Sequence, residues 1–110
     1  AKTLFPYTTL FRSMNATAST YNTGATINFT TSENAQSKVY YSTDWLQMYE
    51  TDNDVIFNNG SVAMTDTSFR TSHSVTLNNL QSNTNYYYVI YTKDASGNVS
   101  IKYTSSFRTQ

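Results

Sequence analysis

From residue 14 onward, hydrophobic and polar residues alternate with a period of two along several short segments. In Gly24–Thr30, the side chains of Ala25, Ile27 and Phe29 fall on one face, and polar Thr26 and Asn28 fall on the other. Because successive side chains of a β-strand point to opposite faces, this alternation predicts a half-buried strand. The same pattern predicts four further strands, over Ser37–Thr43, Ser74–Leu77, Tyr86–Thr92 and Val99–Arg108.

The alternation also assigns faces within these strands. Val39 and Tyr41 share one face, with Lys38 and Tyr40 opposite, and Val75 and Leu77 point inward. In the next strand, one face carries Tyr86, Tyr88 and Ile90, and the other carries Tyr87, Val89 and Tyr91; in the last strand, Phe107 is expected to point inward.

Turn-forming residues separate the predicted strands. They occur at Asn22-Thr23-Gly24, Ser32-Glu33-Asn34, Asn58-Asn59-Gly60 and Ser96-Gly97-Asn98. Several short strands with regular turns are typical of a β-sandwich. Only Asp44–Glu50 favours an amphipathic helix, because Trp45, Met48 and Tyr49 follow i, i+3, i+4 spacing.

The composition agrees with strands that have one wetted face. Of the 110 residues, 38% are hydrophobic, and the chain carries 19 Thr, 14 Ser and 12 Asn. An aromatic content of 15% argues against disorder, since disordered chains are poor in aromatic residues. The length is that of one domain, in which the neutral polar residues cover the outer faces and turns.

Charge and residue types exclude several function classes. A formal net charge of zero argues against nucleic-acid binding, and no apolar run reaches the roughly 20 residues of a membrane span. The chain has no Cys and one His, and it lacks a Gly-x-Ser-x-Gly elbow. Asp52-Asn53-Asp54 begins like a calcium loop but lacks the glycine and the closing glutamate. We therefore expect no enzyme activity, no catalytic residue, no metal and no cofactor.

The N-terminal segment stands apart from this pattern. Residues 3–13 resemble the conceptual translation of a short-read sequencing adaptor over their whole length. We therefore expect residues 1–13 to be non-native and residues 14–110 to form the domain; an ordinary strand and a signal-peptide remnant are the alternatives. Because the segment is apolar and β-prone, we expect either a monomer or edge-strand association through residues 3–11.

The second half of the chain carries a family resemblance. The run Val75–Tyr86 resembles the E–F segment of fibronectin type III domains, with Leu77 and Leu80 as its leucine pair. Tyr86 is then the tyrosine corner, whose hydroxyl bonds to nearby backbone. Asp94–Ser100 is similar to the F–G turn of bacterial surface copies, and Phe29 stands where the family has its core Trp.

The resemblance implies a fold over residues 14–110. The implied fold is a seven-stranded, immunoglobulin-like fibronectin type III sandwich with sheets A-B-E and C′-C-F-G. The resemblance is strongest over residues 73–109 and weakest over residues 44–70, where the connection between strands C and E is longer than usual. Trp45, which lies in this connection, is therefore not the core Trp.

The family implies a non-catalytic spacer or adhesion module of a larger bacterial extracellular or cell-surface protein. An accessory domain of a secreted hydrolase, with carbohydrate binding as one role, is the alternative, and a surface-filament subunit is a weaker one. A similar sandwich precedes the metal domain of purple acid phosphatases, with counterparts of Val39, Tyr41 and His73. From the sequence, His73 is expected to begin a strand and cap local backbone.

A tyrosine-rich outer face is the candidate binding surface. If strands C and F are neighbours, one stripe contains Tyr40, Tyr87 and Tyr91, joined by Tyr103 and extended by Trp45 and Tyr49. Flat aromatic rings with hydroxyl groups suit contacts to a protein or a glycan. The competing interpretation is that these tyrosines only stabilise the sheet through cross-strand pairs.

Overall fold

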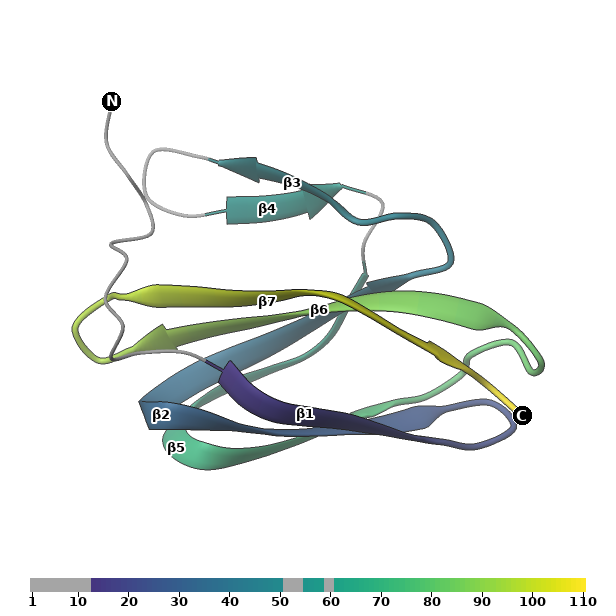
Figure 1. Cartoon of the computed structure of the whole chain (residues 1–110), viewed down its shortest axis with the longest axis horizontal. Coiled ribbons are helices and arrows are strands. Elements are labelled where there is room, and N and C mark those ends of the chain that lie inside the picture. Colours follow the sequence, from purple (N-terminus) through teal and green to yellow (C-terminus); the bar gives the residue numbers. More distant parts are fainter. Residues whose placement is uncertain (1–12, 51–54, 59–60) are drawn as a thin grey trace.

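All regular structure in the described chain is β-structure. The computed structural model describes residues 13–50, 55–58 and 61–110, and no helix occurs in these ranges. The prediction of an all-β protein is therefore confirmed (Figure 1). The strands are β1 (Ser13–Thr20), β2 (Ala25–Ser42), β3 (Gln47–Glu50), β4 (Val55–Asn58), β5 (Ser61–Leu77), β6 (Asn85–Asp94) and β7 (Val99–Arg108).

Two long strands curl the main sheet. The first half of β2 pairs with β1 and with residues 72–77 of β5. The second half of β2 pairs with the beginning of β5 on one side and with β6 on the other. Strand β7 then pairs with β6. The β2–β5 register shifts between Thr30 and Ala35 and again before Ser37, where the chain turns from one layer to the other. The segments predicted as separate strands, Gly24–Thr30 and Ser37–Thr43, are thus one continuous strand.

The first hydrophobic core lies between the two layers of the curled sheet. Its residues come from the faces that the alternation assigned inward. They are Ala25, Ile27, Phe29, Val39, Val75, Leu77, Leu80, Tyr86, Tyr88, Ile90 and Phe107, and Tyr41 packs against them. The inward assignments of Val75, Leu77 and Phe107 are therefore confirmed, as are the shared faces predicted within β2 and β6. Phe29 and Leu80 are buried in the same core.

A second core lies on the other side of β6. Strands β3 and β4 form a separate two-stranded antiparallel sheet. Figure 1 shows this hairpin above the layer that contains β6 and β7. Leu46, Val55 and Phe57 are buried there against side chains of the main sheet, which are Tyr40, Val89 and Tyr91, with Val99 and Ile101 at the margin.

The helix predicted over Asp44–Glu50 was wrong, because Gln47–Glu50 is strand β3. Trp45, Met48 and Tyr49 all remain substantially exposed, so the helical stripe is not a buried face. The residue that enters the second core is Leu46, which is 1% exposed and lies outside that stripe.

Two turns fix the ends of the strands. Gly24 lies so close to β5 that a Cβ atom there would be 2.6 Å from the Leu77 carbonyl oxygen. In the β6–β7 turn, Asp94 Oδ1 accepts hydrogen bonds from the Ser96 and Asn98 amides, and Oδ2 accepts one from Asn98 Nδ2. Gly97 supplies the positive φ of 89° that this turn requires.

Candidate functional site

Two exposed aromatic residues of the predicted site, Trp45 and Tyr87, lie against each other. Their rings meet edge to face with centroids 5.4 Å apart, and Trp45 is 49% exposed. Such a pair is a favourable aromatic arrangement that also holds both rings in place. The two rings therefore contact each other while keeping much of their surface in water.

Local structure explains how Trp45 reaches Tyr87. Ser42, the last residue of β2, pairs with Tyr87 on β6. The Ser42 Oγ atom then accepts a hydrogen bond from the Asp44 amide at 3.0 Å, which turns the chain back over the sheet. The burial of Leu46 in the second core anchors the next position, so Trp45 is held between a turn and a buried neighbour.

Tyr40 and Tyr91 are not part of an exposed stripe. The structure places them beneath the β3–β4 hairpin, where they are 8% and 3% exposed. The Tyr40 ring packs on Phe57 with centroids 4.7 Å apart, and Lys38 Nζ lies 5.1 Å from the centre of the Tyr91 ring. Their predicted exposure was wrong, because the β3–β4 hairpin, which the local pattern did not predict, covers this face.

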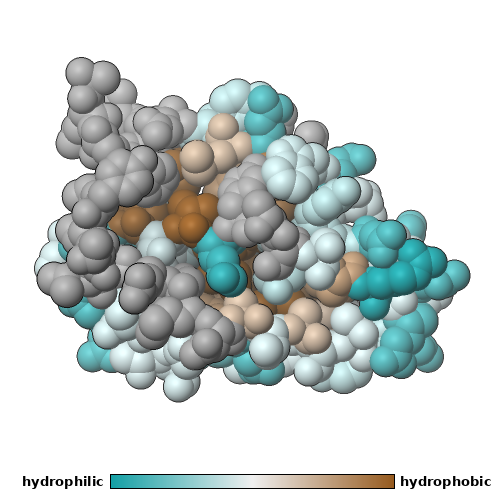
Figure 2. All heavy atoms as spheres, in the orientation of Figure 1, coloured by the Kyte–Doolittle hydropathy of each residue, from teal (hydrophilic) through white to brown (hydrophobic). Residues whose placement is uncertain are grey.

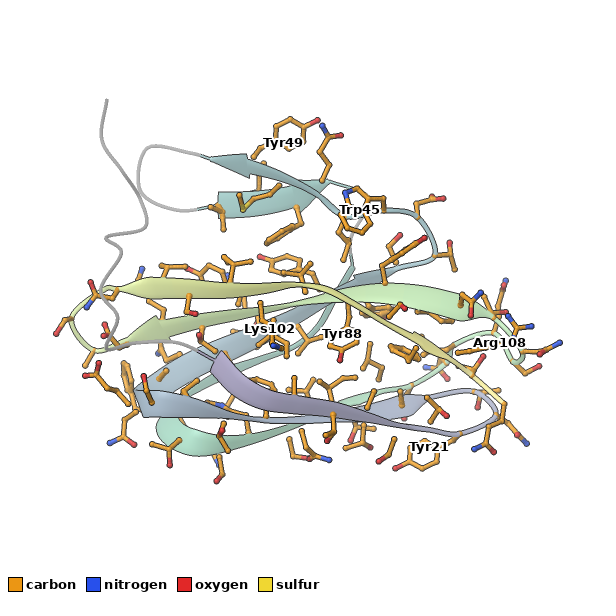
Figure 3. All side chains as sticks on the ribbon, in the orientation of Figure 1. Tyr21, Trp45, Tyr49, Tyr88, Lys102 and Arg108 are labelled. Atoms are coloured by element: carbon orange, nitrogen blue, oxygen red, sulfur yellow. The ribbon has the colours of Figure 1, made fainter. Side chains whose placement is uncertain are left out.

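The remaining predicted residues are divided between two places. Tyr49 pairs with Ile56 on the outer side of the hairpin, and both are exposed. Figure 3 shows Tyr49 pointing away from the main sheet, whereas Trp45 lies at the end of the hairpin. Tyr103 belongs to β7, but its side chain lies outside the described structure.

Hydrophobic surface also continues around the hairpin. On the face drawn in Figure 2, hydrophobic residues gather between the hairpin and the sheet beneath it. The large exposed hydrophobic side chains of this region are Trp45, Met48, Tyr49, Ile56 and Tyr87. The candidate site is therefore the rim and outer side of the hairpin rather than the open sheet face that was expected. We refer to Trp45 and Tyr87 as the aromatic pair.

Tyr86 forms the hydrogen bond that was expected of a tyrosine corner. Its hydroxyl oxygen accepts the Gln81 amide proton at 2.8 Å, and its ring stacks on Phe107. Asn79 and Asn83 adopt positive φ angles in the loop before it. Tyr86 is thus a structural residue in the first core, away from the aromatic pair.

His73 is in the interior rather than at the start of a strand. It is 4% exposed within β5, a strand that begins at Ser61, thirteen residues earlier than expected. Its ring stacks on Phe29 with centroids 4.7 Å apart and planes 6° apart, and Nε2 lies 3.2 Å from Thr31 Oγ1. Burial lowers the pKa of His73 below the ordinary 6.5, and the Asp66 carboxylate opposes this only in part.

Other chemistry in the described residues is limited. Within these ranges, no group of three or more His, Cys, Asp or Glu side chains is placed to hold a metal ion. Asp52 and Asp54, considered above for calcium, lie outside the described residues. None of the described segments is a helix of the length and apolar character needed to cross a membrane.

Comparison with known proteins places this geometry in a family. Residues 12–109 match the model of the purple acid phosphatase N-terminal domain. The chain belongs to this family. The match agrees with the resemblance carried by Val39, Tyr41 and His73, all of which lie in or against the first core or its edge. The catalytic domain that gives the family its name is not covered by this match.

Other comparisons add little. No curated protein matches the chain. A similar solved structure is the sensor domain of the anti-sigma factor RsgI4 from Pseudobacteroides cellulosolvens. It is 17% identical, the alignment covers 90% of this chain and 91% of that one, and the TM-score is 0.42.

The second core is what the sequence analysis missed. A signal for it was present, because Val55 and Phe57 alternate with Ile56 after an Asp-Asn-Asp turn. That alternation is typical of a strand, but the helical spacing of Trp45, Met48 and Tyr49 gave a conflicting prediction for the partner segment.

Proposed function

We propose that the domain is a non-catalytic interaction module with a fibronectin type III-like sandwich fold. In this interpretation, β1, the first half of β2 and the end of β5 correspond to sheet A-B-E. The start of β5, the second half of β2, β6 and β7 correspond to sheet C′-C-F-G. Support comes from the strand pairing and from the hydrogen bond between Gln81 and Tyr86. The β3–β4 hairpin is then an insertion between C and C′.

The observation that carries the proposal is the exposed aromatic pair. Large aromatic side chains that are already held in one orientation lose little conformational freedom on binding. Trp and Tyr also dominate the residues whose truncation weakens protein contacts most. Met48, Tyr49 and Ile56 of the neighbouring hairpin are also exposed, which adds to the apolar surface of this region.

The proposed setting is a larger secreted or cell-surface protein, in which the hairpin packs on a neighbouring domain. The family name refers to a domain that accompanies a phosphatase. This supports the role of an accessory domain beside a hydrolase over that of a free-standing adhesion module or a filament subunit. Such a module contributes positioning, and the chemistry belongs to the neighbouring domain.

The test compares the domain alone with the domain inside its full-length parent protein, using a Trp45→Ala/Tyr87→Ala double variant. We expect attachment to the neighbouring domain to raise the melting temperature of the native module, and the double substitution to remove that increase. Phe69→Ala is the matched control, because Phe69 is 48% exposed on β5 and belongs to neither hydrophobic core. An increase that survives the double substitution contradicts the proposal.

Glycan binding is the second candidate. It is favoured by the planar rings of the aromatic pair, since aromatic faces stack on sugar rings, and by the exposed polar residue Gln47, two positions after Trp45 in the chain. Trp45 is the only tryptophan in the chain, so its fluorescence reports directly on this surface. Titration with a panel of neutral oligosaccharides should shift the emission in the native module and in Phe69→Ala. The absence of any shift, together with unchanged amide NMR signals, would exclude this role.

A further inference from the structure

The corner at which β5 passes from one layer to the other is held by few contacts. Between the pairs Ser37–Asp66 and Thr30–Ser72, backbone pairing is limited to Arg70 with Ala35. One side-chain hydrogen bond, from Gln36 Nε2 to the Thr67 carbonyl at 2.8 Å, also joins this segment to β2. The side chains of residues 67–72 are all exposed. The local ion pair between Arg70 Nε and Asp66 Oδ2, at 2.8 Å, lies within this segment and does not attach it to β2.

Buried His73 lies directly after this segment and connects it to β2. The Thr31 hydroxyl on β2 contacts three groups: the Glu33 carbonyl at 2.7 Å, His73 Nε2 at 3.2 Å and the Arg70 carbonyl at 3.3 Å. A hydroxyl has one hydrogen, and the shortest contact is to a carbonyl, which only accepts. Thr31 therefore donates its hydrogen to the Glu33 carbonyl and accepts one from His73 Nε2. This assigns His73 as the neutral tautomer that carries its hydrogen on Nε2.

The other ring nitrogen has no partner. His73 Nδ1 is buried and forms no hydrogen bond within the described structure. In the assigned tautomer it carries a lone pair, which a buried site tolerates better than an unpaired N–H. A second proton would have to be placed there, so it would add both a buried charge and an unsatisfied donor.

A groove next to His73 provides space into which its protonated ring can turn. The groove has a volume of about 410 Å³ and is lined by residues of β2 and β5, including Phe29, Asp66, Arg70 and His73. The charged groups that act on His73 are the Asp66 carboxylate and the Arg70 guanidinium, both on β5. From β2, the Phe29 ring and the Thr31 hydroxyl face the His73 ring. The Glu33 side chain is exposed, and only its carbonyl takes part.

We propose that His73 is an acid-sensitive latch, which holds residues 66–72 of β5 against β2 when neutral and releases them when protonated. In the released state, the ring leaves its stack on Phe29 and turns toward Asp66 through the groove. Thr31 loses its contact with His73 Nε2, and the weakly paired corner opens while the cores on either side remain folded. Segments with few buried contacts are those that open locally in proteins.

The direction of the pH effect follows from linkage. The pKa of His73 is lower in the closed state than the ordinary 6.5, because of burial. The latch is therefore fully closed above pH 6.5, and its stability is lost as the pH falls from 6.5 toward the pKa of the closed state. Below that pKa, the ratio of open to closed forms stops rising.

His73 is the only histidine in the chain, so its titration is measurable without interference. We would follow its ring signals by NMR and measure amide hydrogen exchange at about pH 7.5 and about pH 5, corrected for intrinsic rates. We expect the ring to titrate below the ordinary value. Exchange of residues 66–72 should rise at low pH, and the rise is at most the ratio of the acid dissociation constants of the closed and open states. Exchange in β6 and β7 should not change.

The matched variant is His73→Phe, which retains a ring to stack on Phe29 but cannot be protonated. It should show no pH-dependent rise in exchange at residues 66–72, and His73→Leu serves if the phenylalanine variant does not fold. The native titration decides the question even without variants. An ordinary pKa with no change in exchange would overturn the latch. An equal rise across β6 and β7, or the same rise in the variants, would also overturn it.

Discussion

Replacing Tyr86 with Phe tests the hydrogen bond that fixes the loop before β6. The substitution removes one oxygen atom and keeps the ring, which is buried and stacks on Phe107 with centroids 5.6 Å apart. The lost interaction is the 2.8 Å bond from the Gln81 amide. A typical net hydrogen bond contributes about 1 kcal/mol, and a buried donor left unpaired costs up to about 3 kcal/mol.

The exposure of Gln81 decides between these values. Gln81 is exposed and the bond is only partly buried, so water can reach the freed amide. We therefore expect Tyr86→Phe to lower the free energy of unfolding by about 1 kcal/mol. For a domain of this size, that corresponds to a fall of about 4–8 °C in the melting temperature.

Tyr88→Phe is the control for this measurement. Tyr88 lies on the same face of the same strand, is 4% exposed and packs on the same Phe107 ring, but it is not the residue that accepts the Gln81 amide proton. Urea denaturation followed by circular dichroism gives both free energies under identical conditions. Equal effects of the two substitutions would refute the assignment of a specific stabilising role to the Tyr86 hydroxyl.

Three further substitutions test other parts of the fold. Leu46→Ala should lower the free energy of unfolding by about 2–3 kcal/mol in urea titrations by leaving a cavity under the hairpin; a loss below about 1 kcal/mol would argue that the hairpin packs loosely. Gly24→Ala should reduce the melting temperature, because the new methyl group meets the Leu77 carbonyl, and an unchanged calorimetric trace would contradict that contact. Asp94→Ala should cost about 1–3 kcal/mol and speed amide exchange at Ser96 and Asn98, whereas unchanged exchange would show that the carboxylate does not hold this turn.

The first core was predictable because its residues alternate strictly. In β6, Tyr86, Tyr88 and Ile90 share one face whatever the partner strand is, since successive residues of a strand point to opposite faces. The Gln81–Tyr86 hydrogen bond was also accessible, through the spacing of Leu80 and Tyr86 in the resemblance to the fibronectin type III pattern. Local sequence therefore contained most of what determines the two layers.

The covering hairpin was not predictable in the same way. The alternation correctly assigned Val89 and Tyr91 to the face opposite the first core, but it could not say whether water or protein lies against that face. The answer depends on Leu46 and Phe57, which reach Tyr40 across a separate sheet. A tyrosine next to water and a tyrosine under a hairpin have the same local pattern, and only tertiary packing separates them.

The position of His73 was missed for a related reason. Its alternation with Val75 and Leu77 indicates the inward face, but the prediction began the strand at Ser74. The strand extends to Ser61 because the second half of β2 offers it a partner through the curl of the sheet. Pairing of this kind depends on the course of another strand and leaves no signal in the residues around His73.

The continuity of β2 through both layers has a consequence for synthesis of the chain. Its residues pair with β1, which precedes it, but also with β5 and β6, which leave the ribosome much later. Contacts between segments far apart in sequence make folding slow. During synthesis, Ala25–Ser42 can therefore pair with β1 but not yet with β5 or β6. Its many Thr, Ser and Asn side chains keep the segment soluble until those strands have been synthesised.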